Sequence, residues 1–393
     1  MICRARPKYI KKTYKDFIDY YYSNADMNSG CEADKYYYNG GSNALEHFLS
    51  CYNSYYNKKA RVAVQTFTCV SVLNAVINSG SVALLYDVSK EDCSIDYDLI
   101  DFEIPMDILI ITHYQGIPNK SYLKFAEKCK EKNIILLDDL SHGTDSIIDN
   151  IKLGSLSNVY IESYAWDKPY TCLYGGSLFI NEIDSRFRDF YENEYSKLDQ
   201  ESEFRAKKDI KLIYFLLNYT RPEYYYLDFD YALFFSFRLL KYMYSPIFFR
   251  LKIYRMFLMF FYKVMNKLSF LNTKNEILKM AEVKKCFLNF QRDDNILSSK
   301  LLPHIPEKYK ADCFLFDNER MNIIWNRFSL IDYEGKLKTY FSELDMSADN
   351  FNWPSCVHEY IKNDKVNCYY MTDFFNSEYL KNHILNVPIW HIK

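Results

Sequence analysis

Short apolar runs alternate with amphipathic stretches from about residue 40 to 182. The runs are rich in β-branched residues and bounded by polar ones, which is typical of strands buried in a sheet. The predicted strands are Arg61–Val64, Val82–Tyr86, Asp107–Thr112 and Ile134–Leu137. Apolar positions at the helical period predict the helices Ala44–Tyr52, Cys69–Asn78 and Tyr122–Lys132. This alternation predicts an α/β domain with a mostly parallel central sheet and helices on both faces.

The rest of the chain divides by the same pattern. Residues 1–30 begin with basic residues that no apolar core follows, and we predict an N-terminal arm. Residues 31–195 form the predicted large domain, and residues 196–276 an aromatic, basic and mainly helical insertion. Residues 277–393 return to an ordinary pattern that opens with a predicted helix over Ile277–Phe290. They are predicted to form a small C-terminal α+β domain.

The insertion contains an unusual segment, residues 231–275. It is dense in Phe, Tyr, Leu and Met and carries eight Lys and Arg residues but no Asp or Glu. No uncharged run in it approaches the roughly 20 apolar residues of a spanning helix. Two interpretations remain open: peripheral contact with a membrane interface, or packing against the core or a dimer partner.

Composition and charge narrow the class of protein. Hydrophobic residues make up 49% and charged residues 25%, the balance of a folded soluble chain. The net charge of −2 gives no indication of nucleic-acid binding. The eleven cysteines form no CxxC pair and have no His partner at zinc spacing, so we expect reduced thiols, no metal site and a cytoplasmic location.

Two acids stand at the carboxyl end of a predicted strand in IILLDDLSHG, residues 134–143. A carboxylate beside a pyridine nitrogen favours the protonated ring, which pyridoxal phosphate (PLP) needs as an electron sink. Asp138 or Asp139 could have this role. Strand-end acids also commonly cap the next helix, so the pair alone does not decide the function.

A lysine and a helix start add to this picture. Lys168 lies on a turn between a strand that ends at Ser163 and another that opens at Gly175-Gly176. A lysine held there partly desolvated can form a Schiff base, although a lone lysine is more often a solvated surface residue. In NGGSNALEHFL, residues 39–49, small residues lead into a helix whose free N–H groups suit a phosphate. A simple N-cap by Ser42 is the alternative there.

Several separated motifs resemble one family in order and spacing. Gly40–Leu45 (GGSNAL) is similar to its phosphate-loop pattern SGTxAL, and Gln65–Val76 (QTFTCVSVLNAV) to its PxxTxxxxxNAV block with Gln65 replacing the proline. Residues 112–118 (THYQGIP) look like its HxxG.P element, and Asp138–His142 (DDLSH) like its EDAAQ or EDAAH motif. The chain thus resembles the DegT/DnrJ/EryC1/StrS family of PLP-dependent sugar aminotransferases, which have the type I aminotransferase fold.

The remaining motifs continue this resemblance to the C-terminus. Gly154–Ser157 matches the family's GSLG, Ser163 to Lys168 its SxxxxK, and residues 383–391 its closing LPxH segment. The resemblance implies that Lys168 binds the cofactor aldehyde, Asp139 the pyridine nitrogen and His142 the ring hydroxyl. These three are the expected catalytic residues. The other expected cofactor-binding residues are Gly41, Ser42, Asn43, Cys69 and Ser163.

The implied reaction is transfer of an amino group, from glutamate, onto a nucleotide-linked keto-sugar for surface polysaccharide or glycan biosynthesis. The implied assembly is a homodimer. Sugar 3-dehydratases of the family carry histidine instead of the Schiff-base lysine, and Lys168 argues against that activity. Two further alternatives are a PLP enzyme acting on a lipid-linked or non-sugar substrate, and a binding or regulatory protein that keeps the fold without turnover.

Three features depart from the family pattern. The aromatic residue that stacks on the cofactor ring falls at Cys69, the residue after the lysine is Pro169, and residues 186–275 contain the aromatic insertion. A cysteine offers a smaller contact than an aromatic face. We therefore predict that Cys69 lies by the ring and that His113 or Tyr114 supplies part of the missing contact.

Overall fold

The computed structural model describes residues 14–23, 34–165, 168–219, 276–292, 305–316, 319–343, 356–361 and 367–387. The basic and aromatic segment 231–275 lies outside the described residues, and so do both interpretations proposed for it. None of the described helices is both long and apolar enough to cross a membrane.

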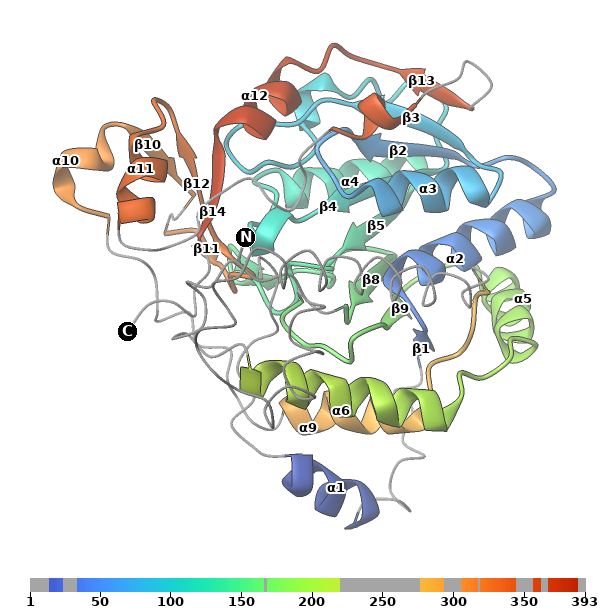
Figure 1. The fold of residues 1–393 in the computed structure, drawn as a ribbon. Helices are drawn as coiled ribbons and strands as arrows, with labels where there is room; N and C mark the ends of the chain where they lie inside the picture. Colours follow the sequence, from blue (N-terminus) through green and yellow to red (C-terminus); the bar gives the residue numbers. More distant parts are fainter. Residues whose placement is uncertain are drawn as a thin grey trace, which may run out of the picture.

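An eight-stranded sheet forms the centre of the molecule (Figure 1). Its order is β1 (Lys35–Tyr38), β9 (Gly176–Ile180), β8 (Val159–Ser163), β5 (Ile135–Asp139), β4 (Ile108–Thr112), β2 (Arg61–Gln65), β3 (Val82–Tyr86) and β13 (Cys368–Tyr370). The strands from β8 to β13 pair in parallel, whereas β9 pairs antiparallel with both β8 and β1. The predicted α/β class with a mostly parallel sheet is confirmed.

Helices cover both faces of this sheet because alternate strand residues point to opposite sides. In β4, Ile108 and Ile110 belong to one hydrophobic cluster, and Leu109 and Ile111 to another. The first cluster packs under α2 (Gly41–Tyr56), α3 (Val70–Asn78) and α5 (Ser185–Ser196), the second under α4 (Tyr122–Lys132). The predicted strands and intervening helices are confirmed, with α2 extending further at both ends than predicted.

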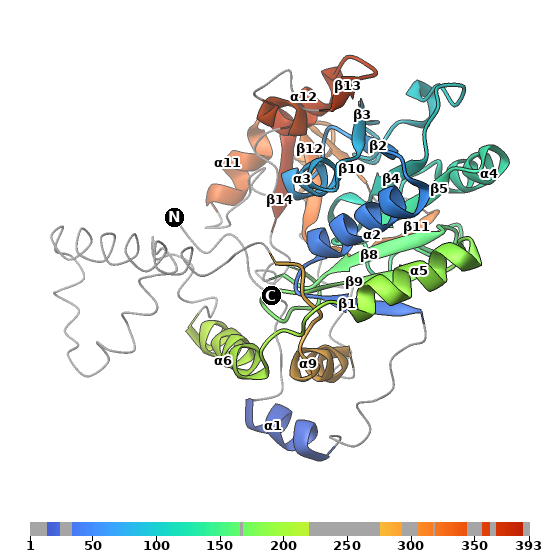
Figure 2. The same cartoon turned by 90° about the vertical axis from the view of Figure 1, so that its right-hand side faces the viewer.

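A layer of three helices lies beyond the β1 edge of the sheet, where both views show them side by side (Figures 1 and 2). They are α1 (Tyr14–Ser23), α6 (Glu203–Tyr219) and α9 (Glu282–Arg292). Phe17 of α1 packs edge-on against Phe287 of α9, with 4.9 Å between the ring centroids. Lys284 of α9 is fully buried, and its Nζ lies 2.7 Å from Glu201 Oε1 and 2.9 Å from Asp209 Oδ2.

The predicted helix over Ile277–Phe290 begins five residues later than expected, at Glu282. The segment before it is extended because hydrogen bonds to distant parts of the chain hold it. The N–H of Asn39 donates to Leu278 O (3.0 Å), the N–H of Leu278 donates to Asn39 Oδ1 (3.1 Å), and Lys279 bridges to Tyr38 and Gln200. Tertiary hydrogen bonding here overrides the helical period.

The C-terminal part builds a small antiparallel sheet in the order β10 (Cys313–Leu315), β12 (Phe328–Asp332) and β14 (Ile384–Val387). The helices α10 (Glu307–Lys310), α11 (Lys336–Glu343) and α12 (Phe375–His383) lie near it (Figure 1). A further small sheet joins β11 (Met321–Asn322) to β6 (Ile147–Ile148), which pairs with β7 (Ile151–Lys152). C-terminal segments therefore contact the large sheet at β13 and the loops that follow β5.

Candidate active site

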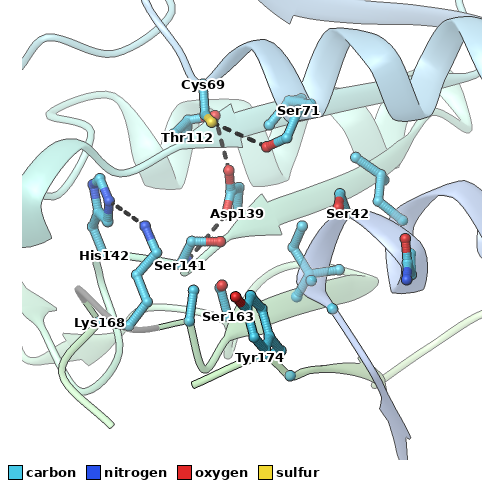
Figure 3. Close-up of a pocket in the computed structure, with 18 of the residues that line it drawn as sticks. Ser42, Cys69, Ser71, Thr112, Asp139, Ser141, His142, Ser163, Lys168 and Tyr174 are labelled. Atoms are coloured by element: carbon cyan, nitrogen blue, oxygen red, sulfur yellow. Dashed lines mark hydrogen bonds between the residues drawn. The ribbon is translucent and has the colours of Figure 1, made fainter. Parts of the chain in front are cut away.

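A cavity of about 460 Å³ opens at the carboxyl ends of the parallel strands (Figure 3). Thr112, Asp139 and Ser163, the last residues of β4, β5 and β8, all line it. This is the edge of an open α/β sheet at which ligands bind. The cavity also brings together all the site residues expected from the sequence: Gly41, Ser42, Asn43, Cys69, Asp139, His142, Ser163 and Lys168.

The N-terminus of α2 points its unpaired backbone groups at this cavity. Gly40 is the N-cap residue and makes no side-chain capping bond, and the first intrahelical bond runs from the N–H of Ala44 to Gly40 O (3.1 Å). The N–H groups of Gly41, Ser42 and Asn43 precede that bond and suit an anion. The alternative that Ser42 is the N-cap is wrong, because Ser42 is the second residue of the helix.

Two glycines allow the helix start to sit directly on the ends of the strands. A Cβ added to Gly176 would lie 2.2 Å from the backbone nitrogen of Gly41, and one added to Gly41 would lie 3.2 Å from Ser163 Cβ. No larger side chain fits at Gly176 without moving the helix. The resulting cradle holds the Ser163 hydroxyl beside the N-terminus of α2, which is a donor set suited to a phosphate.

The two neighbouring acids of β5 have different surroundings. Asp139 lines the cavity; its Oδ1 accepts the N–H of Ser141 (3.0 Å) and its Oδ2 the hydroxyl of Thr112 (3.4 Å). Asp138 is fully buried in the core, where its Oδ2 accepts the hydroxyl of Tyr122 and the N–H of Gly154 (3.1 Å). Successive strand residues point to opposite faces, so only Asp139 is available to a ligand.

Lys168 and His142 are in direct contact in the cavity (Figure 3). Nζ of Lys168 lies 2.7 Å from Nε2 of His142. The other ring nitrogen, Nδ1, accepts the N–H of Gln115 (3.3 Å). Lys168 follows β8 by five residues and His142 follows β5 by three. Because β5 and β8 are neighbouring parallel strands, both residues lie at the same edge of the sheet.

The cavity has two facing walls. Figure 3 shows Cys69, Ser71 and Thr112 on one side and Ser163, Lys168 and Tyr174 on the other. Cys69 is the N-cap residue of α3, and its Sγ accepts the hydroxyl of Ser71 (3.0 Å).

The expectation that His113 or Tyr114 supplies a contact beside Cys69 is wrong. Both side chains are fully buried and neither lines the cavity. His113 Nδ1 accepts the N–H of Asn119 (3.3 Å), and the hydroxyl of Tyr114 donates to Asn386 Oδ1 (3.0 Å). Their strand-end loop turns them into the core instead.

Tyr174 is a lining residue that sequence reasoning missed. Its side chain is 57% exposed, and its backbone carbonyl accepts Nζ of the buried Lys284 (3.1 Å). Leu173 before it has a φ of 73°, a conformation that is costly for a residue other than glycine. Among 38 tyrosines, no signal in the sequence separates this one.

Thr112, Ser71 and Ser141 also line the cavity without having been predicted to do so. Thr112 could have been found from the sequence, because it ends a predicted strand that neighbours the strand of Asp139. The pairing of β4 with β5 sets these two residues opposite one another. The positions of Ser71 and Ser141 depend on turns that the hydrophobic pattern does not describe.

Solved structures share this architecture at low sequence identity. PseC of Helicobacter pylori, described as an aminotransferase involved in the biosynthesis of pseudoaminic acid, matches with a TM-score of 0.60 and 12% identity over 98% of this chain and 93% of its own. The aminotransferase TlmJ of Streptoalloteichus hindustanus matches with a TM-score of 0.60 and 12% identity over 100% and 96%. GDP-4-keto-6-deoxy-D-mannose-3-dehydratase of E. coli matches with a TM-score of 0.57 and 12% identity over 96% and 88%.

These likenesses show the type I aminotransferase-like fold, as the sequence predicted. No curated protein matches the sequence of the chain. Residues 37–201 match the profile of the DegT/DnrJ/EryC1/StrS aminotransferase family, and this segment includes every residue that lines the cavity. Over this segment, the chain is similar to the DegT/DnrJ/EryC1/StrS aminotransferase family.

Proposed function

We propose that this protein is a PLP-dependent aminotransferase that uses Lys168, Asp139 and His142 for catalysis. One observation supports this most strongly: an amine, a carboxylate and the N-terminus of α2 line the same cavity. The match of residues 37–201 to the profile of the DegT/DnrJ/EryC1/StrS aminotransferase family supports it as well.

The residues of the cavity fit the chemical groups of PLP. The cradle between the N-terminus of α2 and Ser163 suits the phosphate, and the Gly41–Asn43 amides would hold it. The carboxylate of Asp139 suits the pyridine nitrogen, since an anionic partner favours the protonated ring. When bound, PLP supplies an electron-poor ring that stabilises negative charge at the substrate carbon.

The protein's own residues would then move and hold protons. The ε-amine of Lys168, once released by the incoming amine, would accept the proton from the substrate carbon and return it at the neighbouring position. His142 would hold the ring oxygen in place. Because Asp139 is only 3% exposed, water competes little with its contact to the ring nitrogen.

For the substrates, we propose glutamate as the amino donor and a nucleotide-linked keto-sugar as the acceptor, in a homodimer. The description of PseC as an aminotransferase in the biosynthesis of pseudoaminic acid supports a sugar acceptor. The fold alone does not choose the reaction, because the E. coli relative of the same fold is a 3-dehydratase. Lys168 in the cavity supports amino transfer over dehydration.

Reduction with borohydride tests the role of Lys168. The purified protein with PLP should absorb in the visible range, and borohydride should fix the cofactor to the peptide that contains Lys168. A Lys168→Ala variant should lose this label, whereas Lys152→Ala, which changes a largely exposed lysine paired with Asp145, should keep it. A label on another lysine would refute the assignment.

Isotope-labelled glutamate tests the reaction. Incubation with PLP and a panel of nucleotide-linked keto-sugars should give an amino-sugar that carries the label, detected by mass spectrometry. A spectral shift with glutamate but no labelled sugar would indicate a lipid-linked or non-sugar acceptor. A cofactor band that glutamate does not change would favour a binding or regulatory protein without turnover.

A further inference from the structure

The turn after β4 contains a backbone outlier that contacts a residue of the candidate site. Gln115 has a φ of 52° and a ψ of 17°, in the left-handed region, and Gly116 after it has a φ of 99°. A residue other than glycine pays a conformational cost there, and such outliers gather at functional sites. Gln115 is fully buried, so the conformation is not that of a solvated loop tip.

A distant segment holds this turn in place. The N–H of Asn326 donates to Gln115 O (3.0 Å), and Asn326 Nδ2 donates to Gln115 Oε1 (3.1 Å). A Cβ added to Gly116 would lie 2.4 Å from Ile324 O, so the turn sits directly on the backbone of that segment. Asn326 is itself only 4% exposed.

The left-handed turn aims the N–H of Gln115 at Nδ1 of His142. Of the three forms of an imidazole, the charged form and the Nδ1–H tautomer both carry a proton on Nδ1. In either of these two forms, the proton on Nδ1 would point at the N–H of Gln115, so that two donors would face each other in a buried site. The neutral ring with its proton on Nε2 is the form that accepts this hydrogen bond.

We propose that the turn at Gln115, braced by Asn326, is a positioning device that fixes His142 as the Nε2–H tautomer. In this form the Nε2–H group points at Nζ of Lys168, 2.7 Å away, and donates to the lone pair of a neutral amine there. A donor at Nε2 suits an anionic ring oxygen of the cofactor, and this part of the inference rests on the proposed function. Neither Gln115 nor Asn326 lines the cavity, so both act through His142.

Nuclear magnetic resonance of the full chain, labelled with nitrogen-15 in its histidine rings, reads the tautomer without any turnover. His142→Gln assigns the signal. We expect the Nε2–H form to exceed the Nδ1–H form by about tenfold, a ratio that one buried hydrogen bond supports. Predominance of the Nδ1–H or the charged form at pH 7.5 would overturn the proposal.

Two substitutions separate the backbone of Gln115 from its side chain. Gln115→Gly and Gln115→Val both remove the side-chain amide and keep the backbone N–H. Glycine adopts the left-handed conformation readily, whereas valine resists it. We expect Gln115→Gly to keep the Nε2–H form and Gln115→Val to lose its excess. Equal behaviour of the two variants would show that the backbone conformation does not set the tautomer.

Asn326→Ala keeps the proposal testable if Gln115→Val does not fold. It removes the side-chain brace and should reduce the excess of Nε2–H severalfold, and Asn326→Gln should restore part of it. An unchanged ratio in Asn326→Ala would exclude the brace. A protein that shows the predicted tautomer but never absorbs with PLP would refute the proposed function and leave this inference standing.

Discussion

The two acids of β5 offer a direct test of the site, because one substitution at each should affect a different property. Asp139→Asn changes the carboxylate that lines the cavity, and Asp138→Asn changes its buried neighbour. We expect the first to lower turnover with little effect on the fold. We expect the second to lower stability and leave the cavity side chains unchanged.

The hydrogen bonds set the size of each effect. Asp138 Oδ2 accepts the Tyr122 hydroxyl and the Gly154 N–H, and bonds to a charged group contribute about 1.5–3 kcal/mol each against about 1 kcal/mol for neutral ones. An amide oxygen can accept both bonds without charge, so Asp138→Asn should cost about 2 kcal/mol of the free energy of unfolding.

Asp139→Asn should cost less than about 1 kcal/mol in stability. The amide oxygen can still accept the N–H of Ser141, and the amide nitrogen can donate to the hydroxyl of Thr112, which is free to rotate. Turnover should fall by about 100- to 1000-fold, because an amide does not stabilise the protonated ring as a carboxylate does.

Thermal unfolding and turnover of both variants, measured on the same preparations with PLP, decide the matter. Asp138→Asn should lower Tm by about 4 °C and keep most of the turnover. Asp139→Asn should lose most of the turnover and keep Tm close to that of the parent. Borohydride should still label Lys168 in Asp139→Asn. Turnover near that of the parent in Asp139→Asn, or its loss in a fully stable Asp138→Asn, would refute the assignment of the two acids.

Three further predictions concern the fold. Gly176→Ala should lower the free energy of unfolding by about 3 kcal/mol in chemical denaturation, because its Cβ meets the backbone of Gly41, whereas Gly40→Ala, with ordinary contacts, should change it little. Burial lowers the pKa of His47 from 6.5 to about 4, so stability should fall as pH drops through this range, and His47→Gln should abolish that slope. Burial raises the pKa of Asp92 from 3.8 to about 7, so its contribution to stability should fall as pH rises between these values, and Asp92→Asn should flatten the fall.

The site residues expected from the sequence gather in one cavity because most of them lie close to strand ends. Asp139 and Ser163 end strands, and the Gly41–Asn43 run opens a helix, so the hydrophobic pattern alone gives their approximate positions. Lys168 needed the resemblance to a family, since a lone lysine on a turn has no local signal. Residues 277–281 were predicted wrongly because the hydrogen bonds that hold them extended come from Asn39, far away in the chain.

The sequence by itself determined the alternation of strands and helices, the parallel sheet and the edge at which the candidate site lies. These depend on local periodicity and on the handedness and burial of parallel strands. It also determined that neighbouring acids point to opposite faces. Which of the two faces the cavity depended on the register of β5 against β4 and β8.

Only the tertiary structure decided which side chains surround His142 and what fills the walls of the cavity. Asn326 braces Gln115 from 211 residues away, and Lys284 holds the carbonyl of Tyr174 from 110 residues away. Such contacts are set by how packed elements meet and not by the period of any one element. A single sequence carries no local signal for them, because each partner taken alone is an ordinary polar residue.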